Sequence, residues 1–161
     1  MKIRILTYED IEKWINLSSE YDCYIEELVQ DLTEWYQGNK NEPSFGFYME
    51  SKIKQKEAFM AIDDFDNCLG IVAISIKNNR ITFFGISHNA DINSIGNLLL
   101  KHSISLLDRN KEIGINEIAS KSDWIKKCKE IIIGNGFIQK DDSLECGVPV
   151  NTFIRKGNFD T

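Results

Sequence analysis

The sequence lacks the features that mark several specialised classes of protein. Only two of its 161 residues are prolines and ten are glycines, so the composition offers no flexible linker between domains. The four cysteines, at positions 23, 68, 128 and 146, form no CxxC pair and no short spacing to a histidine, which disfavours zinc and redox sites. The longest apolar runs are far shorter than the roughly 20 residues of a membrane span. We expect one folded domain without a metal ion and without attachment to a membrane.

An excess of basic residues is also missing. The net charge of −6 argues against a large nucleic-acid surface, because phosphate backbones are bound by clustered lysine and arginine. The first six residues mix charged with apolar side chains and do not resemble a signal peptide, so we expect a cytoplasmic protein. With 42% apolar and 27% charged residues, the composition is that of an ordinary folded chain.

Alternating and helical hydrophobic patterns divide the chain into strands and helices. The patterns predict strands at residues 2–6, 58–62, 69–76, 81–87, 115–119, 137–138 and 148–154. They predict helices that begin after Thr7 and near residue 25, followed by helices at residues 45–56, 93–109 and 123–134. This order predicts a single α/β domain over residues 1–155, with a tail at 156–161 and a mixed central sheet covered by helices on both faces.

The segment where the fourth predicted strand meets the next helix is the best candidate for a binding site. The first backbone N–H groups of a helix have no partner inside it and carry the positive end of its dipole, which suits a phosphate. We expect free N–H groups at Ser94, Ile95, Gly96 and Asn97, and a glycine at 96 lets a ligand approach the backbone closely. By itself this pattern leaves a plain structural joint open as the alternative.

Two motifs at and after this joint resemble those of the GNAT acyltransferases. The family's acyl-CoA motif reads Q/R-x-x-G-x-G/A before a run of leucines, and the chain has Asp91-Ile92-Asn93-Ser94-Ile95-Gly96 followed by Asn97-Leu98-Leu99-Leu100. The family's glycine–phenylalanine pair after the following helix is matched by Gly134-Asn135-Gly136-Phe137. The resemblance covers residues 1–155 and includes the opening strand and helix.

The resemblance implies a mostly antiparallel sheet of about seven strands, in which strands 81–87 and 115–119 splay apart. Backbone groups of Ile86 and Ser87 would pair with the pantetheine arm of a coenzyme as though it were an extra strand. The diphosphate would lie on the backbone N–H groups of Asn93, Ser94, Ile95, Gly96 and Asn97. The implied function is an acetyl-CoA-dependent N-acetyltransferase acting on a primary amine of a small molecule or peptide. Acetyl-CoA is then the co-substrate, no metal takes part, and the protein is a monomer or homodimer.

Three positions depart from the family pattern. Asp91 stands where the family carries a cation or glutamine, and its carboxylate would repel a diphosphate. Ser94 replaces the first glycine of the motif. Ile132 stands where a tyrosine commonly serves as general acid, and a hydrocarbon side chain cannot donate a proton. The sequence therefore leaves a second function open, a catalytically inactive GNAT-fold module that binds acyl-CoA or regulates a partner.

His88 and Glu117 are the candidate catalytic residues. A histidine titrates near neutral pH and suits base chemistry, and Glu117 could deprotonate the amine through a water. The plain alternatives are an exposed loop histidine and a surface glutamate. Tyr24, Tyr36 and Tyr48 either reach an acceptor cleft or pack in the core.

Two further patterns have both a functional and a structural interpretation. Ser122 or Asp123 either caps the helix at 123–134 or helps to hold the coenzyme. Nine acidic residues fall between Glu9 and Glu34. If some of them line the acceptor side they favour a cationic amine, and otherwise they form a solvated helix face.

Overall fold

The computed structural model describes residues 1–29, 43–145 and 147–158. The strands are β1 (Lys2–Ile5), β2 (Ala58–Ile62), β3 (Cys68–Ser75), β4 (Arg80–Ile86), β5 (Ile113–Ile118), β6 (Ile138–Glu145) and β7 (Val148–Arg155). The helices are a short 3-10 helix η1 (Tyr8–Asp10), α1 (Ile11–Ser19), α2 (Asp22–Glu26), α4 (Pro43–Lys54), α5 (Ile92–Leu106) and α6 (Asp123–Gly134). None of these helices combines the length and the apolar character that crossing a lipid bilayer requires.

One mixed sheet joins all seven strands in the order β1-β2-β3-β4-β5-β7-β6. The β4–β5 pair is parallel, and α5 connects the two strands, as a parallel pair requires a crossover. Every other neighbouring pair is antiparallel. The predicted mixed, mostly antiparallel sheet is confirmed.

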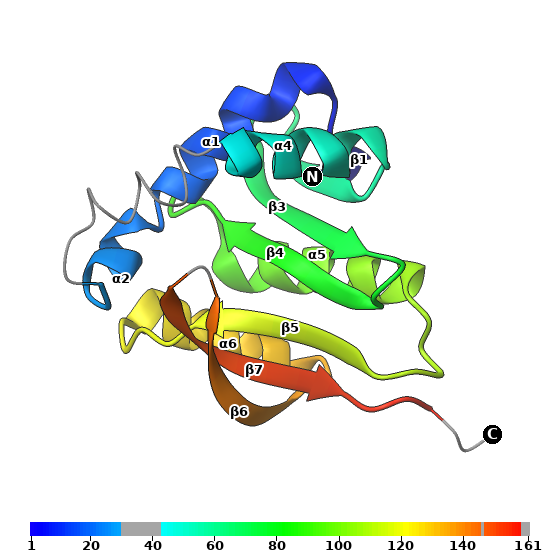
Figure 1. Cartoon of the computed structure of the whole chain (residues 1–161). Helices are drawn as coiled ribbons and strands as arrows, with labels where there is room; N and C mark the ends of the chain where they lie inside the picture. The colour runs from blue at the N-terminus through cyan, green and yellow to red at the C-terminus, as the bar shows by residue number, and fades with distance from the viewer. Residues whose placement is uncertain (30–42, 146, 159–161) are drawn as a thin grey trace.

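Helices cover both faces of this sheet, as predicted. One face packs against α5 and α6, which lie behind β4 and β5 in the view of Figure 1, around buried residues such as Leu99, Leu100 and Phe153. The other face packs against α1, α2 and α4 around Trp14, which is fully buried and makes edge-to-face contacts with Tyr48 and Phe83.

An ion-pair network fixes the start of the chain against the sheet. The guanidinium of Arg4 on β1 donates to both carboxylate oxygens of Asp10 at 2.7 and 2.9 Å, and also bonds to Asp66 at 2.8 Å. Asp10 in turn accepts the backbone N–H of Thr7 at 2.8 Å. The hydrogen bonds from Arg4 lower the pKa of Asp10 to about 2 despite its burial. Asp10, one of the acidic residues predicted in the first turn after Thr7, therefore connects that turn to β1 through Arg4.

Most predicted elements differ from the structure by one to three residues at their ends, and two differ more. The strand predicted at 137–138 is β6, which starts at Ile138 and is eight residues long. All its side chains are exposed, because β6 is an edge strand, so its polar sequence carries no apolar alternation. The helix predicted near residue 25 is represented by α2, and its predicted continuation through residues 30–38 lies outside the described residues.

Candidate functional site

Strands β4 and β5 run side by side only at their first residues. Their pairing consists of Arg80 with Gly114 and Ile81 with Ile115. On their far edges, β4 stays paired with β3 and β5 with β7 over their whole lengths. The two strands therefore diverge inside a continuous sheet, and no strand of the described residues pairs with the β5-facing edge of β4 beyond Ile81 (Figure 1). We call the space between the diverging ends the splay; its prediction from the motifs is confirmed.

Tyr21, in the turn between α1 and α2, reaches the free edge of β4. Ser87 N–H donates to Leu69 O on the β3 side, so the N–H and C=O of Ile86, one residue earlier, point away from β3 and toward the splay. The Tyr21 hydroxyl donates to Ile86 O at 2.7 Å and accepts from Ile86 N–H at 2.7 Å. The two backbone groups of Ile86 that were predicted to pair with pantetheine are thus bonded to a side chain of the protein.

The hydroxyl of Tyr21 is fully used in this position. A phenol has one donor and two acceptor sites, and the indole N–H of Trp124 on α6 fills the last one at 3.1 Å. Tyr21 is only 7% exposed, and its burial raises the pKa of the phenol far above the usual range. Tyr21 and Trp124 therefore bridge β4 to α6 across the splay.

Asp91 caps the helix that was predicted to hold the diphosphate. One of its carboxylate oxygens accepts from the backbone N–H of Asn93 at 3.2 Å and of Ser94 at 3.4 Å. The other accepts from the Ser94 hydroxyl at 3.1 Å. This is the usual N-cap arrangement, in which a side-chain oxygen serves the first free N–H groups of a helix. Besides its charge, Asp91 therefore occupies two of the donors that a phosphate would use.

The prediction that the N–H groups of residues 94–97 are all free is wrong. The helix begins at Ile92, one residue earlier than predicted, so Ile95 N–H already donates to Asp91 O at 3.0 Å. Gly96 is buried, and a Cβ there would lie 2.8 Å from Cδ1 of Ile131 on α6. The glycine therefore allows α5 to pack closely on α6, a reason separate from the predicted approach of a ligand. Coenzyme binding by residues 93–97 stays a prediction.

Glu117 lies on β5 where it has diverged from β4, and it is buried rather than at the surface. Only 6% of the residue is exposed, Oε1 accepts from Ile118 N–H at 2.9 Å, and Oε2 has no partner among the described residues. Burial raises the pKa of this carboxyl from an ordinary 4.5 to about 7, with Lys129 opposing the shift. Glu117 alternates with Ile113 and Ile115 on the buried face of β5, the face that packs against α5 and α6. The surface alternative for Glu117 is wrong.

His88 lies just beyond the end of β4 in a cluster of aromatic rings. Its Nε2 is 2.7 Å from the Tyr24 hydroxyl, and its Nδ1 is 3.5 Å from Glu20 Oε1. Glu20 Oε1 also accepts the backbone N–H of His88 at 2.8 Å. The rings of Tyr21 and Trp124 lie 5.6 and 4.8 Å from the imidazole, centre to centre. His88 is therefore an exposed residue beyond the end of its strand, as the loop alternative expects, but its imidazole contacts a tyrosine and a glutamate.

The remaining candidates have structural positions. Tyr48 packs against Trp14, and its hydroxyl bonds to Thr82 at 2.7 Å, which fits the core alternative. Ser122 is the N-cap of α6, without a side-chain cap bond. Ile132 is fully buried in the core beneath the sheet. Tyr36 lies outside the described residues.

Tyr21, Trp124 and Glu20 are the site residues that sequence reasoning missed. Tyr21 is in phase with the apolar repeat of Ile25 and Leu28, but it lies before the predicted start of that helix, in the turn that precedes α2. The available signal was a group of aromatic and acidic residues at a helix junction, but one sequence does not say which strand end this junction faces. Among the described residues, no three His, Cys, Asp or Glu side chains are placed to hold a metal ion.

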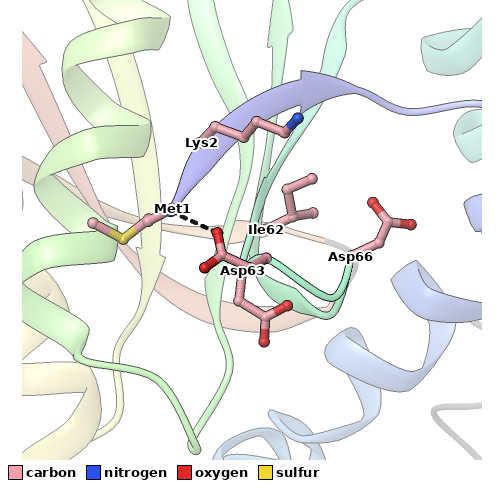
Figure 2. Close-up of a pocket in the computed structure, with 6 residues that line it drawn as sticks. Met1, Lys2, Ile62, Asp63 and Asp66 are labelled. Carbon is pink, nitrogen blue, oxygen red and sulfur yellow. Dashed lines mark ion pairs between the residues drawn. The ribbon is translucent and has the colours of Figure 1, made fainter.

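A separate hollow lies at the β1 edge of the sheet. It has a volume of about 300 Å³ and is lined by Met1, Lys2, Ile62, Asp63, Asp64 and Asp66, as Figure 2 shows. Two strands, β2 and β3, separate β1 from β4 in the sheet. Asp63 and Asp66 already bond to their own loop, to Arg4 and to Lys13, which accounts for the acidic side chains without a ligand.

Comparison with solved structures identifies the fold. No protein-family model and no curated protein matches the sequence. A GNAT-family acetyltransferase from Streptococcus agalactiae 2603 aligns over 98% of this chain and 95% of its own, with TM-score 0.67 and 14% identity. The ribosomal-protein-S18-alanine N-acetyltransferase from Escherichia coli aligns over 99% and 96%, with TM-score 0.59 and 10% identity. One chain of the NatC complex bound to Gag peptide and CoA aligns over 98% of this chain and 100% of its own, with TM-score 0.60 and 13% identity. The fold of this chain is that of the GNAT acetyltransferases.

Proposed function

We propose that the chain is an acetyl-CoA-dependent N-acetyltransferase that acts on a primary amine of a small molecule or peptide. The observation that carries the proposal is the carboxyl group of Glu117 at the splay, which is buried and has an oxygen without a partner in the described part of the chain. An unpaired buried carboxyl costs stability, so its presence calls for a role. A pKa of about 7 is close to what a general base needs at neutral pH.

The proposed reaction needs a neutral amine and a proton for the departing sulfur. Glu117 accepts the proton that the ammonium group of the acceptor loses. The amine nitrogen then forms a bond to the thioester carbonyl carbon, the carbon–sulfur bond breaks, and the sulfur takes up one proton. His88, bonded to Tyr24, supplies this proton in place of a residue at position 132, and it takes up in exchange the second proton that the amine nitrogen loses as the amide forms.

The charge around the splay favours a cationic acceptor. Glu20 contacts His88, and Glu27 on the α2 side accepts from Ser120 at 2.8 Å. Glu145 on β6 accepts from Asn116 of β5 at 3.1 Å. Together with Glu117 these side chains outnumber the ammonium of Lys129, which donates to Ser120 O at 3.3 Å, and they attract ammonium groups. The proteins of like fold support an amine acceptor, since one acetylates an alanine of a ribosomal protein and another binds a peptide together with CoA.

The splay fits an extended chain that carries amide groups. Ile86 offers one donor and one acceptor on a free strand edge, which is the pattern by which an added strand binds. Tyr21 holds both groups in the free protein, so binding requires the phenol to leave. At the start of α5, Asp91 must likewise release two N–H groups or share them through solvent.

A second candidate function is a GNAT-fold module without turnover. The observations that favour it are the two internal contacts just named and the buried hydrocarbon side chain of Ile132. This function is consistent with the fold and differs in one measurable property, because no acyl group leaves the coenzyme.

Release of free thiol from acetyl-CoA separates the two functions. The acceptor panel contains polyamines, aminoglycosides, lysine side chains in peptides and peptide N-termini. The first function predicts thiol release that depends on one class of amine and falls at least about 100-fold in Glu117→Gln. Glu112→Gln, the same change at an exposed residue at the start of the strand, is the matched control and keeps the activity. If no acceptor in the panel makes thiol release faster than it is without an amine, the result favours the module instead.

A further inference from the structure

We propose that Tyr21 is an internal competitor of the coenzyme and sets the affinity with which the splay binds it. This inference rests on the proposed function, because it takes the ligand at the free edge of β4 to be the coenzyme. It goes beyond that function by naming the residue that determines how tightly the ligand binds.

The competition follows from hydrogen-bond stoichiometry at Ile86. Beyond Ile81 the inner edge of β4 pairs with no strand in the part of the chain that the structure describes, and Ile86 is the position near its end whose N–H and C=O both face the splay. An extended chain with amide groups that lies along this edge must bond to these two groups. The Tyr21 hydroxyl already engages both at 2.7 Å. A backbone N–H makes one good hydrogen bond, so phenol and ligand cannot hold it together.

The Tyr21 side chain belongs to an element that can release it. It precedes α2, which has only five residues and buries a single side chain, that of Tyr24. A short helix at the rim of the sheet is held by few tertiary contacts, so local opening there costs less than opening of the sheet. The contacts that must be broken are its three hydrogen bonds, the rings of Tyr24 and His88, each 5.6 Å away centre to centre, and its packing in the core cluster around Trp14, where it is 7% exposed.

Release of Tyr21 also changes the surroundings of His88, the candidate proton donor. His88 contacts Tyr21, Tyr24 and Trp124, so a phenol that leaves Ile86 changes the packing on two sides of the imidazole. The coenzyme site and the Tyr24–His88 pair are therefore coupled through one side chain.

The variant Tyr21→Phe tests the competition. It keeps the ring and removes the hydroxyl, so Ile86 loses its partners only in the ligand-free state. The free state is destabilised, the bound state is unaffected, and the Kd for acetyl-CoA in calorimetric titration is expected to fall about tenfold or more. The matched control is Tyr48→Phe, which removes a hydroxyl that bonds to a side chain, Thr82, rather than to the strand edge. Its Kd should equal that of the unmodified protein.

Hydrogen exchange of the Ile86 amide, followed by NMR without ligand, tests the contact itself. The amide should exchange slowly in the unmodified protein and in Tyr48→Phe and faster in Tyr21→Phe, and added acetyl-CoA should slow it again in Tyr21→Phe. If the unmodified protein binds acetyl-CoA and Tyr21→Phe binds it no more tightly, the competitor role is wrong while the proposed function stands. If neither protein binds acetyl-CoA, both proposals are wrong. Equal Ile86 exchange in all three proteins overturns the inference whatever the binding result.

Discussion

Replacing Glu117 by glutamine removes the only ionisable side chain of β5 and with it a pH-dependent cost to stability. In the folded state the pKa of Glu117 is about 7, against an ordinary 4.5. Below pH 4.5 the carboxyl is protonated in both the folded and the unfolded chain. Between the two values the unfolded chain loses the proton and the folded chain keeps it, so the free energy of unfolding falls as the pH rises. At 1.36 kcal/mol per pKa unit the full loss is about 3 kcal/mol, complete above pH 7.

Glutamine has the same shape and keeps an oxygen for the Ile118 N–H, but it cannot ionise. Between pH 5 and pH 8 the free energy of unfolding of Glu117→Gln, relative to the unmodified protein, should therefore rise by about 2–3 kcal/mol. For a domain of this size that is a relative shift in Tm of about 5–10 °C. Chemical unfolding at both pH values measures the difference, and groups common to both proteins cancel. Glu112→Gln is the control. If the pH dependence of Glu117→Gln runs parallel to that of the unmodified protein, the carboxyl is not buried as described.

Two further substitutions test the start of α5. Asp91→Asn keeps an N-cap oxygen for the first N–H groups but removes the charge, so the free energy of unfolding should change by less than about 0.5 kcal/mol. The Kd for acetyl-CoA should fall a few-fold at low salt and less at high salt; equal effects at both would contradict an electrostatic cause. Gly96→Ala places a methyl 2.8 Å from Ile131 Cδ1 and should destabilise the protein by about 1–3 kcal/mol in chemical unfolding, whereas an unchanged midpoint would show that α6 yields freely.

Elements with a strong hydrophobic period were predicted well from the sequence. The helix predicted at 123–134 is α6 with the same bounds, and the strand at 58–62 is β2. The strand β6 was predicted six residues too short, because an exposed edge strand buries no alternate side chains. The spacing of apolar residues indicates which side chains are buried. It therefore gives no signal for an exposed strand that is held only by backbone hydrogen bonds.

The position of the candidate site in the fold was predicted from the sequence, but the side-chain contacts within the site were not. The motif around Gly96 placed the splay correctly, since element order and a parallel crossover fix where β4 and β5 meet. The contact between Tyr21 and Ile86 joins residues 65 apart, and no local pattern encodes it. Glu117 is buried because it lies on the face of β5 that α5 and α6 cover, and only the packed structure shows which face that is. The role of Asp91 as a cap depended on a helix start one residue earlier than predicted.

The central claim is that the free edge of β4 and the start of α5 together form the coenzyme site. Titration of the isotope-labelled protein with acetyl-CoA, followed through backbone amide NMR signals, tests it most directly. We predict saturable shifts concentrated at Ile86, Asn93 and Ser94, with a simultaneous change in the indole N–H signal of Trp124 as Tyr21 leaves it. Shifts that avoid these four groups, or no saturable shift at millimolar acetyl-CoA, would contradict the claim.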